Sequence, residues 1–183
     1  RLVEGRDLGG YLIRGAVLDI VEIGAGGGSI ARVDEAGVLK VGPTSAGAYP
    51  GPACYGRGGT LPTVTDAHAV IGSLSQHAFE DGIVQFNRQL AIDALETHIA
   101  RPLGWSIERA AYAVIDLAIA HMADMVRLAT VRRGLDPRDF SMLTSGGAGP
   151  LHAAAVGAEV GVAHTIVPPL PGMFSASGAT LGE

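Results

Sequence analysis

The sequence predicts an α/β domain, and three observations support that prediction. In the first third, short apolar runs separated by glycine turns are typical of antiparallel hairpins. The middle third has apolar residues at helical spacing. In the last third, strand-like and helical runs alternate, which is typical of a parallel strand pair joined by a crossover helix. Hydrophobic residues make up 48% of the 183 residues, enough for a folded core.

We predict one partial domain over residues 1–183, made of three segments. They are a region of hairpins and a Pro/Gly loop (15–62), a helical region (63–134) and a βαβα segment (139–183). Residues 1–13 show no clear period and carry no prediction.

The hairpin region is built around glycine turns. A strand pattern over residues 15–23 leads into the turn 24–28, and a second strand is predicted over Ser29–Val33. The turn 34–37 then leads to a third strand over 38–41. Connections this short indicate antiparallel pairing.

The stretch that follows, residues 42–62, holds four prolines and six glycines. No regular element survives that density of helix and strand breakers. A loop of this length inside a folded domain is usually functional, so we keep it as a candidate site.

Three helices are predicted in the helical region, over residues 66–74, 88–100 and 107–133. Thr65 or Asp66 is a plausible N-cap for the first helix, and Ser106 for the third. The run Pro102-Leu103-Gly104 is expected to end the second helix, and Gly134 with Pro137 the third.

The last segment alternates strands and helices. A strand is predicted over 140–144, a turn over 146–150 and a helix over 151–160, followed by a strand over 164–167 and a helix over 174–181. This order implies a parallel pair with a crossover.

Charge and composition exclude several classes of protein. A net charge of −5 and an aromatic content of 5% argue against nucleic-acid binding, which needs clustered Lys and Arg or stacking rings. The longest apolar helical stretch carries Asp116, Asp124 and Arg127, which argues against a membrane span. Cys54 is the single cysteine and the sequence shows no secretory leader, so we predict a cytoplasmic protein.

Glycine is the outlier in the composition, with 27 residues, roughly 15% against a usual 7%. The turn Gly-Ala-Gly-Gly-Gly-Ser at 24–29 could take positive φ angles and offer successive backbone N–H groups to an anion, with the Ser29 hydroxyl beside them. A strand follows, and no Lys, so this is not a P-loop. An ordinary glycine-rich hairpin turn explains the pattern equally well.

A second glycine turn, Ser-Gly-Gly-Ala-Gly-Pro at 145–150, lies between a strand and a helix. Pro150 fits the first position of that helix, whose free N–H groups and positive dipole end would face the turn. The alternative is tight packing of strand on helix. We favour ligand binding, because open α/β sheets hold ligands where strands end.

The Pro/Gly loop and the residues after it supply the remaining candidates. Arg57 could clamp an anion. Asp66 and His68 could ligate a cation, or Asp66 could serve as a base. A capping aspartate beside a structural histidine explains these two as well. Cys54 reads better as a small buried residue than as a nucleophile.

Together these motifs resemble the hydantoinase A/5-oxoprolinase family, which includes ketone carboxylase subunits. The resemblance rests on the run Ile-Gly-Ala-Gly-Gly-Gly-Ser-Ile-Ala at 23–31, the loop 42–59, Thr-Val-Thr-Asp-Ala at 63–67, the turn 146–150 and the stretch 168–178. It implies an actin-like (sugar kinase/Hsp70) ATPase fold that uses ATP with Mg²⁺ or another divalent cation. It also implies a phosphate loop made of Gly26, Gly27, Gly28 and Ser29, and a nucleoside loop made of Gly146, Gly147 and Gly149.

The function implied by the resemblance is ATP-dependent opening of a five-membered cyclic amide, of the hydantoin or 5-oxoproline type, with a hydantoinase B-type partner. Arg57 would neutralise charge, and Asp66 would act as metal ligand or base. The alternatives are an ATP-dependent ketone carboxylase subunit, or a non-catalytic subunit for nucleotide binding or assembly. Replacing Gly27 by Val is expected to abolish nucleotide binding and to leave the fold intact.

Two departures from the family pattern bear on these expectations. His68 stands where the family usually has Asn after Thr-Asp-Ala. No Asp-x-Gly-Gly-Thr phosphate hairpin is present, and we expect it upstream of Arg1. The chain is therefore expected to be an inactive fragment of a larger subunit.

Overall fold

A computed structural model describes residues 2–8, 11–18, 20, 22–74, 79 and 84–181. The strands are β1 (Leu2–Leu8), β2 (Tyr11–Leu18), β3 (Ser29–Val33), β4 (Leu39–Ser45), β5 (Ser141–Leu143) and β6 (His164–Ile166). The α-helices are α1 (Val64–Ile71), α2 (Arg88–Leu95), α3 (Arg101–Leu103), α4 (Ile107–Thr130), α5 (Gly149–Val160) and α6 (Phe174–Leu181). A π-helical turn, η3 (Glu96–Ala100), joins α2 to α3, and short 3₁₀ turns are η1 (Ala53–Tyr55), η4 (Val131–Arg133), η5 (Pro137–Asp139) and η6 (Pro171–Met173).

The described strands form three two-stranded sheets, and the predicted α/β class is confirmed. The pairs β1–β2 and β3–β4 are antiparallel, whereas β5 and β6 are parallel and joined through α5. The crossover predicted for the last segment is therefore correct.

The β3–β4 hairpin follows the sequence prediction closely. Its turn is closed by the N–H of Asp34 donating to the carbonyl of Val38 at 2.9 Å, and Gly37 adopts a φ of 76°. Strand β4 runs to Ser45, four residues beyond its predicted end. The strand predicted over 15–23 is only partly correct, because β2 ends at Leu18 and Ile23 lies in irregular backbone. Val21 lies outside the described residues.

Helix α1 begins earlier than predicted. Thr63 is its N-cap, and Asp66 is the residue three positions on, each side chain bonding to the other's backbone N–H in a capping box. The predicted caps, Thr65 and Asp66, are therefore wrong. Asp66 still serves the start of the helix, as the reciprocal member of the cap.

The second predicted helix ends at Gly104, within the run that was expected to end it. After α2 the backbone widens into the π-helical turn η3 and continues through α3 to Gly104, which ends it with a φ of 64°. Pro102 lies directly after this widened turn, as the second residue of α3. Helix α4 begins after the predicted cap Ser106, and the chain turns at Gly134 as expected.

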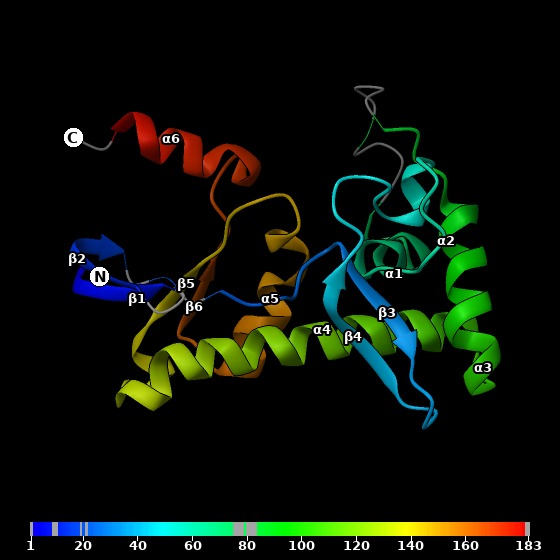
Figure 1. Cartoon of the computed structure of the whole chain (residues 1–183), viewed down its shortest axis with the longest axis horizontal. Coiled ribbons are helices and arrows are strands. Elements are labelled where there is room, and N and C mark those ends of the chain that lie inside the picture. The colour runs from blue at the N-terminus through cyan, green and yellow to red at the C-terminus, as the bar shows by residue number, and fades with distance from the viewer. Residues whose placement is uncertain are drawn as a thin grey trace.

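Helix α4 packs against the other large helices along its whole length. Figure 1 shows α1 and α2 over its N-terminal half and α5 over its C-terminal half. The main core lies between α1, α2 and α4, where Val64, Leu95, Ile99 and Val114 are completely buried. Among the described helices, none is both long and apolar enough to cross a membrane.

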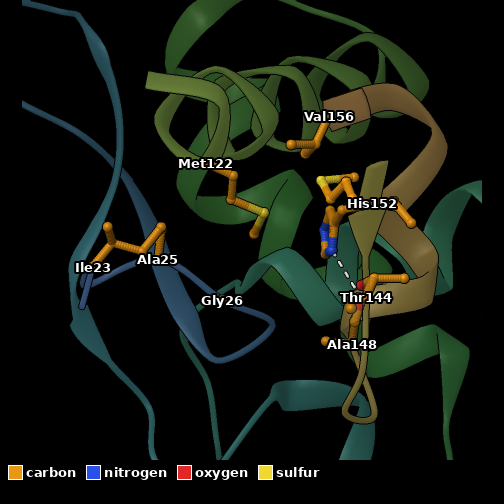
Figure 2. Close-up of a pocket in the computed structure, with 11 residues that line it drawn as sticks. Ile23, Ala25, Gly26, Met122, Thr144, Ala148, His152 and Val156 are labelled. Carbon is orange, nitrogen blue, oxygen red and sulfur yellow. Dashed lines mark hydrogen bonds between the residues drawn. The ribbon is translucent and has the colours of Figure 1, made fainter. Parts of the chain in front are cut away.

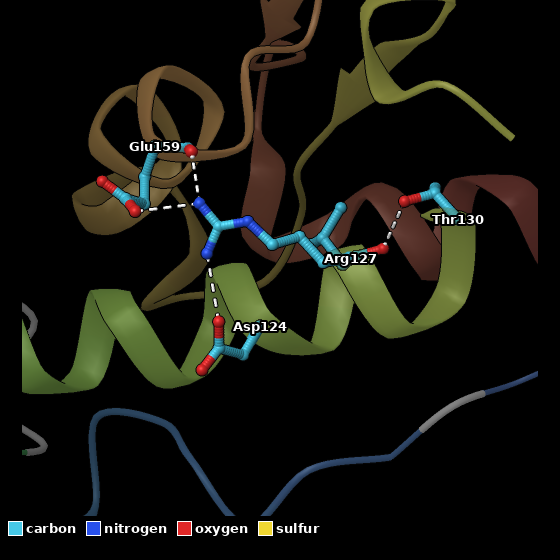
Figure 3. A network of polar contacts seen from close by, with 5 residues as sticks. Asp124, Arg127, Thr130 and Glu159 are labelled. Atoms are coloured by element: carbon cyan, nitrogen blue, oxygen red, sulfur yellow. Dashed lines mark hydrogen bonds and ion pairs between the residues drawn. The ribbon is translucent and has the colours of Figure 1, made fainter. Parts of the chain in front are cut away.

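Arg127 links α4 to the end of α5 (Figure 3). Its guanidinium donates to the backbone carbonyl of Glu159 at 2.6 Å, to the Glu159 carboxylate at 2.9 Å and to Asp124 at 3.0 Å. Because these partners are exposed, the two ion pairs contribute little to the free energy of folding. The geometry nevertheless fixes where α5 lies along α4.

Candidate functional site

The first glycine turn is held in place by short-range and long-range hydrogen bonds. The Ser29 N–H donates to the Gly26 carbonyl at 3.0 Å, and the Gly26 N–H donates to the Ser29 hydroxyl at 2.9 Å. Thr65 of α1 bonds the Gly27 carbonyl twice, from its N–H at 2.8 Å and from its hydroxyl at 2.9 Å. Ser29 is buried and stabilises the turn, so its contact with a phosphate stays a prediction.

Close approach, rather than unusual backbone angles, explains two of these glycines. None of the glycines at 24–28 has a positive φ, contrary to the expectation for this turn. A Cβ on Gly27 would lie 2.7 Å from the Thr65 hydroxyl, and one on Gly28 would lie 2.9 Å from the Ser45 hydroxyl. A side chain at position 27 would therefore require Thr65 to shift, so we expect Gly27→Val to lower stability as well as nucleotide binding. A Cβ on Gly26 would meet no heavy atom within 4 Å.

The second glycine turn leads into α5 as predicted. The N-cap is Ala148, and Pro150 occupies the second position of the helix rather than the first. Gly146 has a φ of 87°, and its N–H donates to the Pro171 carbonyl at 2.8 Å. Gly147 resembles Gly26, because a Cβ there would meet nothing within 4 Å. Neither packing nor backbone conformation requires glycine at these two positions.

The two turns border one cavity of about 310 Å³. In Figure 2, Ile23, Ala25 and Gly26 lie on one side of it, and Thr144, Ala148 and His152 lie on the other. Most of the lining is apolar, with Met122, Met142, Ala153, Val156 and Gly149 completing the wall. The volume lies at the lower end of the range for small-molecule sites. The sequence suggested both turns separately, and the structure brings them together.

Backbone donors at both turns are not used by the fold. The N–H groups of Gly27, Gly28, Gly147 and Ala148 donate no hydrogen bond within the part of the chain that the structure describes. Such N–H groups at a turn, or at the start of a helix, can bind an anion.

One wall of the cavity holds a histidine that the sequence analysis missed. The Nε2 atoms of His152 in α5 and His68 in α1 lie 3.0 Å apart, with the two rings edge to face. Nδ1 of His152 lies 3.0 Å from the Ala148 carbonyl, and Nδ1 of His68 lies 2.6 Å from the Ser73 hydroxyl. Both imidazoles are nearly fully buried. A histidine within a mostly apolar stretch of helix was the only available signal, and it does not identify a partner 84 residues away.

Burial sets the protonation of this pair. It lowers the pKa of His68 to about 4, helped by the neighbouring His152, and it also lowers the pKa of His152. Both rings are therefore uncharged at neutral pH.

We expect acid to destabilise the chain through His68. Its pKa is lower in the folded state than the ordinary value of 6.5, so the unfolded state binds more protons between about pH 6.5 and 4. The stabilisation is complete above about pH 6.5 and is lost as the pH falls, by about 2 kcal/mol at about pH 5. Urea unfolding of the parent and of His68→Gln at both pH values measures it. An equal loss in both proteins would contradict the assignment to His68.

Asp66, predicted as catalytic and as a metal ligand, is fully buried in a network of backbone donors. Its carboxylate accepts from the N–H groups of Ala53 at 3.2 Å, Cys54 at 2.7 Å and Thr63 at 2.8 Å, and from the Thr63 hydroxyl at 2.8 Å. These bonds tie the Pro/Gly loop to α1. Cys54 is buried as predicted, and burial together with Asp66 strongly raises the pKa of its thiol.

Arg57 lies half-buried in the same loop, where its charge acts on the Tyr55 phenol. Among the described residues, those lining the cavity include neither Arg57 nor Asp66. Asp66 faces the loop and His68 faces His152, and no group of three or more His, Cys, Asp or Glu in the described ranges could hold a metal ion. Within the described ranges, Asp66 and His68 therefore do not form a metal site. The catalytic and metal roles stay predictions.

A family model, Hydantoinase/oxoprolinase, matches residues 2–183. The chain belongs to the hydantoinase/oxoprolinase family. Two curated relatives are similar to it: the caprolactamase subunit alpha of Pseudomonas jessenii, 44% identical over 94% of the chain, and the acetophenone carboxylase gamma subunit of Aromatoleum aromaticum, 37% identical over 93%. The chain spans about a quarter of the length of each, 25% and 23%.

Two solved structures share the fold of this hydantoinase/oxoprolinase chain. The crystal structure of the ATP-dependent caprolactamase from Pseudomonas jessenii superposes with a TM-score of 0.86 at 43% identity, over 97% of this chain and 26% of that one. A nucleotide-free structure of acetone carboxylase gives a TM-score of 0.85 at 33% identity, over 97% of this chain and 25% of that one. The resemblance inferred from the motifs is therefore correct.

Proposed function

We propose that this chain supplies part of the nucleotide site of an ATP-dependent enzyme that opens cyclic amides. The observation that carries the proposal is the cavity bordered by both glycine turns, Gly26 on one side and Ala148 with Gly149 on the other. Gly26 and Gly147 support it, because neither needs to be glycine for packing or backbone angle, whereas a nearby ligand would need the space. We also propose that the intact protein has the actin-like ATPase fold that the motifs imply.

The unused backbone donors match the chemistry of a phosphate group. Phosphoryl transfer depends mainly on positioning and on neutralising charge at the phosphate oxygens. The N–H groups of Gly27 and Gly28 at one turn, and of Gly147 and Ala148 at the other, would bind these oxygens. The apolar wall around Met122 and Val156 would exclude water from the site.

In the proposed reaction, the carbonyl oxygen of the amide accepts the terminal phosphoryl group of ATP and ADP leaves. One water would then add to the activated carbon and the ring C–N bond would break, leaving an acyl phosphate and a free amine. A second water would hydrolyse the acyl phosphate to a carboxylate and release phosphate. The caprolactamase relatives widen the substrate class from five-membered rings to cyclic amides in general. The full reaction would need the remaining polypeptide and a partner subunit, for which a hydantoinase B-type chain is our candidate.

Ketone carboxylation is the second candidate, favoured by the acetophenone carboxylase and acetone carboxylase relatives. In that case ATP use would depend on a ketone and bicarbonate. A non-catalytic subunit would bind nucleotide but would show no turnover of ATP, either with a cyclic amide or with a ketone and bicarbonate.

Calorimetry with a non-hydrolysable ATP analogue tests the nucleotide site on this chain, and phosphate release by the assembled enzyme tests the reaction. We expect weak nucleotide binding or none by the chain alone, clear binding by the assembled enzyme, and phosphate release by the assembled enzyme that is stimulated by a lactam or hydantoin. Stimulation only by a ketone with bicarbonate would favour the carboxylase. Absence of nucleotide binding in both the chain and the assembly would refute the proposal.

A further inference from the structure

Helix α1 contacts the first glycine turn directly and is connected to the second through His152 of α5. Thr65 bonds the Gly27 carbonyl of the first turn at 2.8 and 2.9 Å. His68, three residues on and therefore on a neighbouring part of the same helix surface, contacts His152 behind the second turn at 3.0 Å. One short helix thus connects to both borders of the cavity.

The hydrogen bonds of the histidine pair can have only one direction. The Ala148 carbonyl is an acceptor, so Nδ1 of His152 carries the proton and its Nε2 accepts. Nε2 of His68 must then donate to His152, and Nδ1 of His68 accepts from the Ser73 hydroxyl. The Ser73 oxygen also lies 3.3 Å from the His68 carbonyl, a longer contact than the 2.6 Å to the ring. Only one combination of neutral tautomers of the two histidines satisfies every hydrogen bond in the series from Ser73 to the Ala148 carbonyl.

This series of hydrogen bonds ends at Ala148, the residue of the second turn that lies beside the first turn. Ala148 is the N-cap of α5, and its Cβ lies 3.4 Å from where a Cβ on Gly27 would be. A displacement of Ala148 would therefore change the gap between the turns. The hydrogen bonds from Ser73 through His68 and His152 to Ala148 therefore fix the position of the second turn relative to α1, and so its distance from the first turn.

We propose that His68 and His152 are positioning residues that hold the Gly146–Gly149 turn at a fixed distance from the Gly26–Ser29 turn, and thereby set the affinity of the cavity for a nucleotide. The proposal rests on the function proposed above for its binding part. Neither histidine needs to touch the reacting atoms. The hydrogen-bond direction, rather than the ring volume, is what the position requires.

Two substitutions of similar size test whether position 68 requires the hydrogen bonds or only the volume of the side chain. Gln at position 68 has an amide donor for His152 and an oxygen acceptor for Ser73, whereas Leu has neither. We expect His68→Leu to weaken binding of the non-hydrolysable ATP analogue by about tenfold or more, and His68→Gln to stay within about threefold of the parent. His121→Gln, an exposed histidine of α4, is the matched control and should not change binding. Equal affinities for the Leu and Gln variants would overturn the proposal.

A second measurement does not depend on nucleotide binding. Nitrogen NMR of the labelled parent chain should find His152 protonated at Nδ1 and His68 protonated at Nε2. Hydrogen exchange should be faster at residues 146–151 in His68→Leu than in His68→Gln or the parent. If no protein binds nucleotide but these results hold, the proposed function fails and the positioning role stands. The opposite tautomers, or unchanged exchange in the Leu variant, would refute the positioning role.

Discussion

Asp66→Ala is expected to lower the free energy of unfolding by about 4 kcal/mol, a large fraction of the stability of a domain this size. The substitution leaves four buried donors without an acceptor: the N–H groups of Ala53, Cys54 and Thr63, and the Thr63 hydroxyl. It also removes half of the capping box of α1. Urea unfolding at neutral pH measures the loss.

Asp93→Ala is the matched control. Asp93 is exposed and accepts one bond, from Gln89 at 2.8 Å, so its loss should cost less than about 0.5 kcal/mol. An Asp66 variant that keeps its stability and loses only turnover would show that Asp66 is catalytic. A loss of stability with loosening of the Pro/Gly loop would identify a structural carboxylate.

Gly27→Val and Gly26→Val are expected to differ sharply, although the residues are adjacent. Val at 27 would collide with the Thr65 hydroxyl and press on Ala148, so we expect a loss of about 2 kcal/mol in stability together with loss of nucleotide binding. A Cβ at 26 meets no heavy atom within 4 Å and lies beside the cavity, so for Gly26→Val we expect stability to change by less than about 0.5 kcal/mol while binding is lost. Thermal unfolding and calorimetry on both variants measure the two effects.

Each variant serves as the control for the other. Parent-like nucleotide affinity in Gly26→Val would exclude the cavity as the binding site. Parent-like stability in Gly27→Val would mean that Thr65 can move away from the first turn at little cost.

Local signals predicted those parts of the fold that depend on neighbouring residues. The β3–β4 hairpin follows from its glycine turn, α4 from the cap Ser106, and the β5–α5–β6 crossover from the alternation of apolar runs. The start of α1 was misplaced because Thr63, Thr65 and Asp66 are all good capping residues, and the choice depends on tertiary contacts. The π-helical turn before Pro102 has no sequence signal that propensity could detect.

The site was predictable only in part, for the same reason. Glycine clusters identified both turns, because close backbone approach restricts residue type locally. Two partners of Asp66, Ala53 and Cys54, lie 13 and 12 residues away, and His152 lies 84 residues from His68. These pairings depend on how the loop and the helices pack. Asp66 and His68 are neighbours in sequence, but one faces the Pro/Gly loop and the other faces α5.

The distance along the chain between the two borders of the cavity has a kinetic consequence. Gly26 and Gly149 are about 120 residues apart, so joining them requires closure of a long loop, whereas the β3–β4 hairpin and α4 form from near neighbours. We expect the cavity to be completed last as the chain folds, after α5 has docked on α4. A ligand bound there would then report the final step of maturation rather than the first collapse.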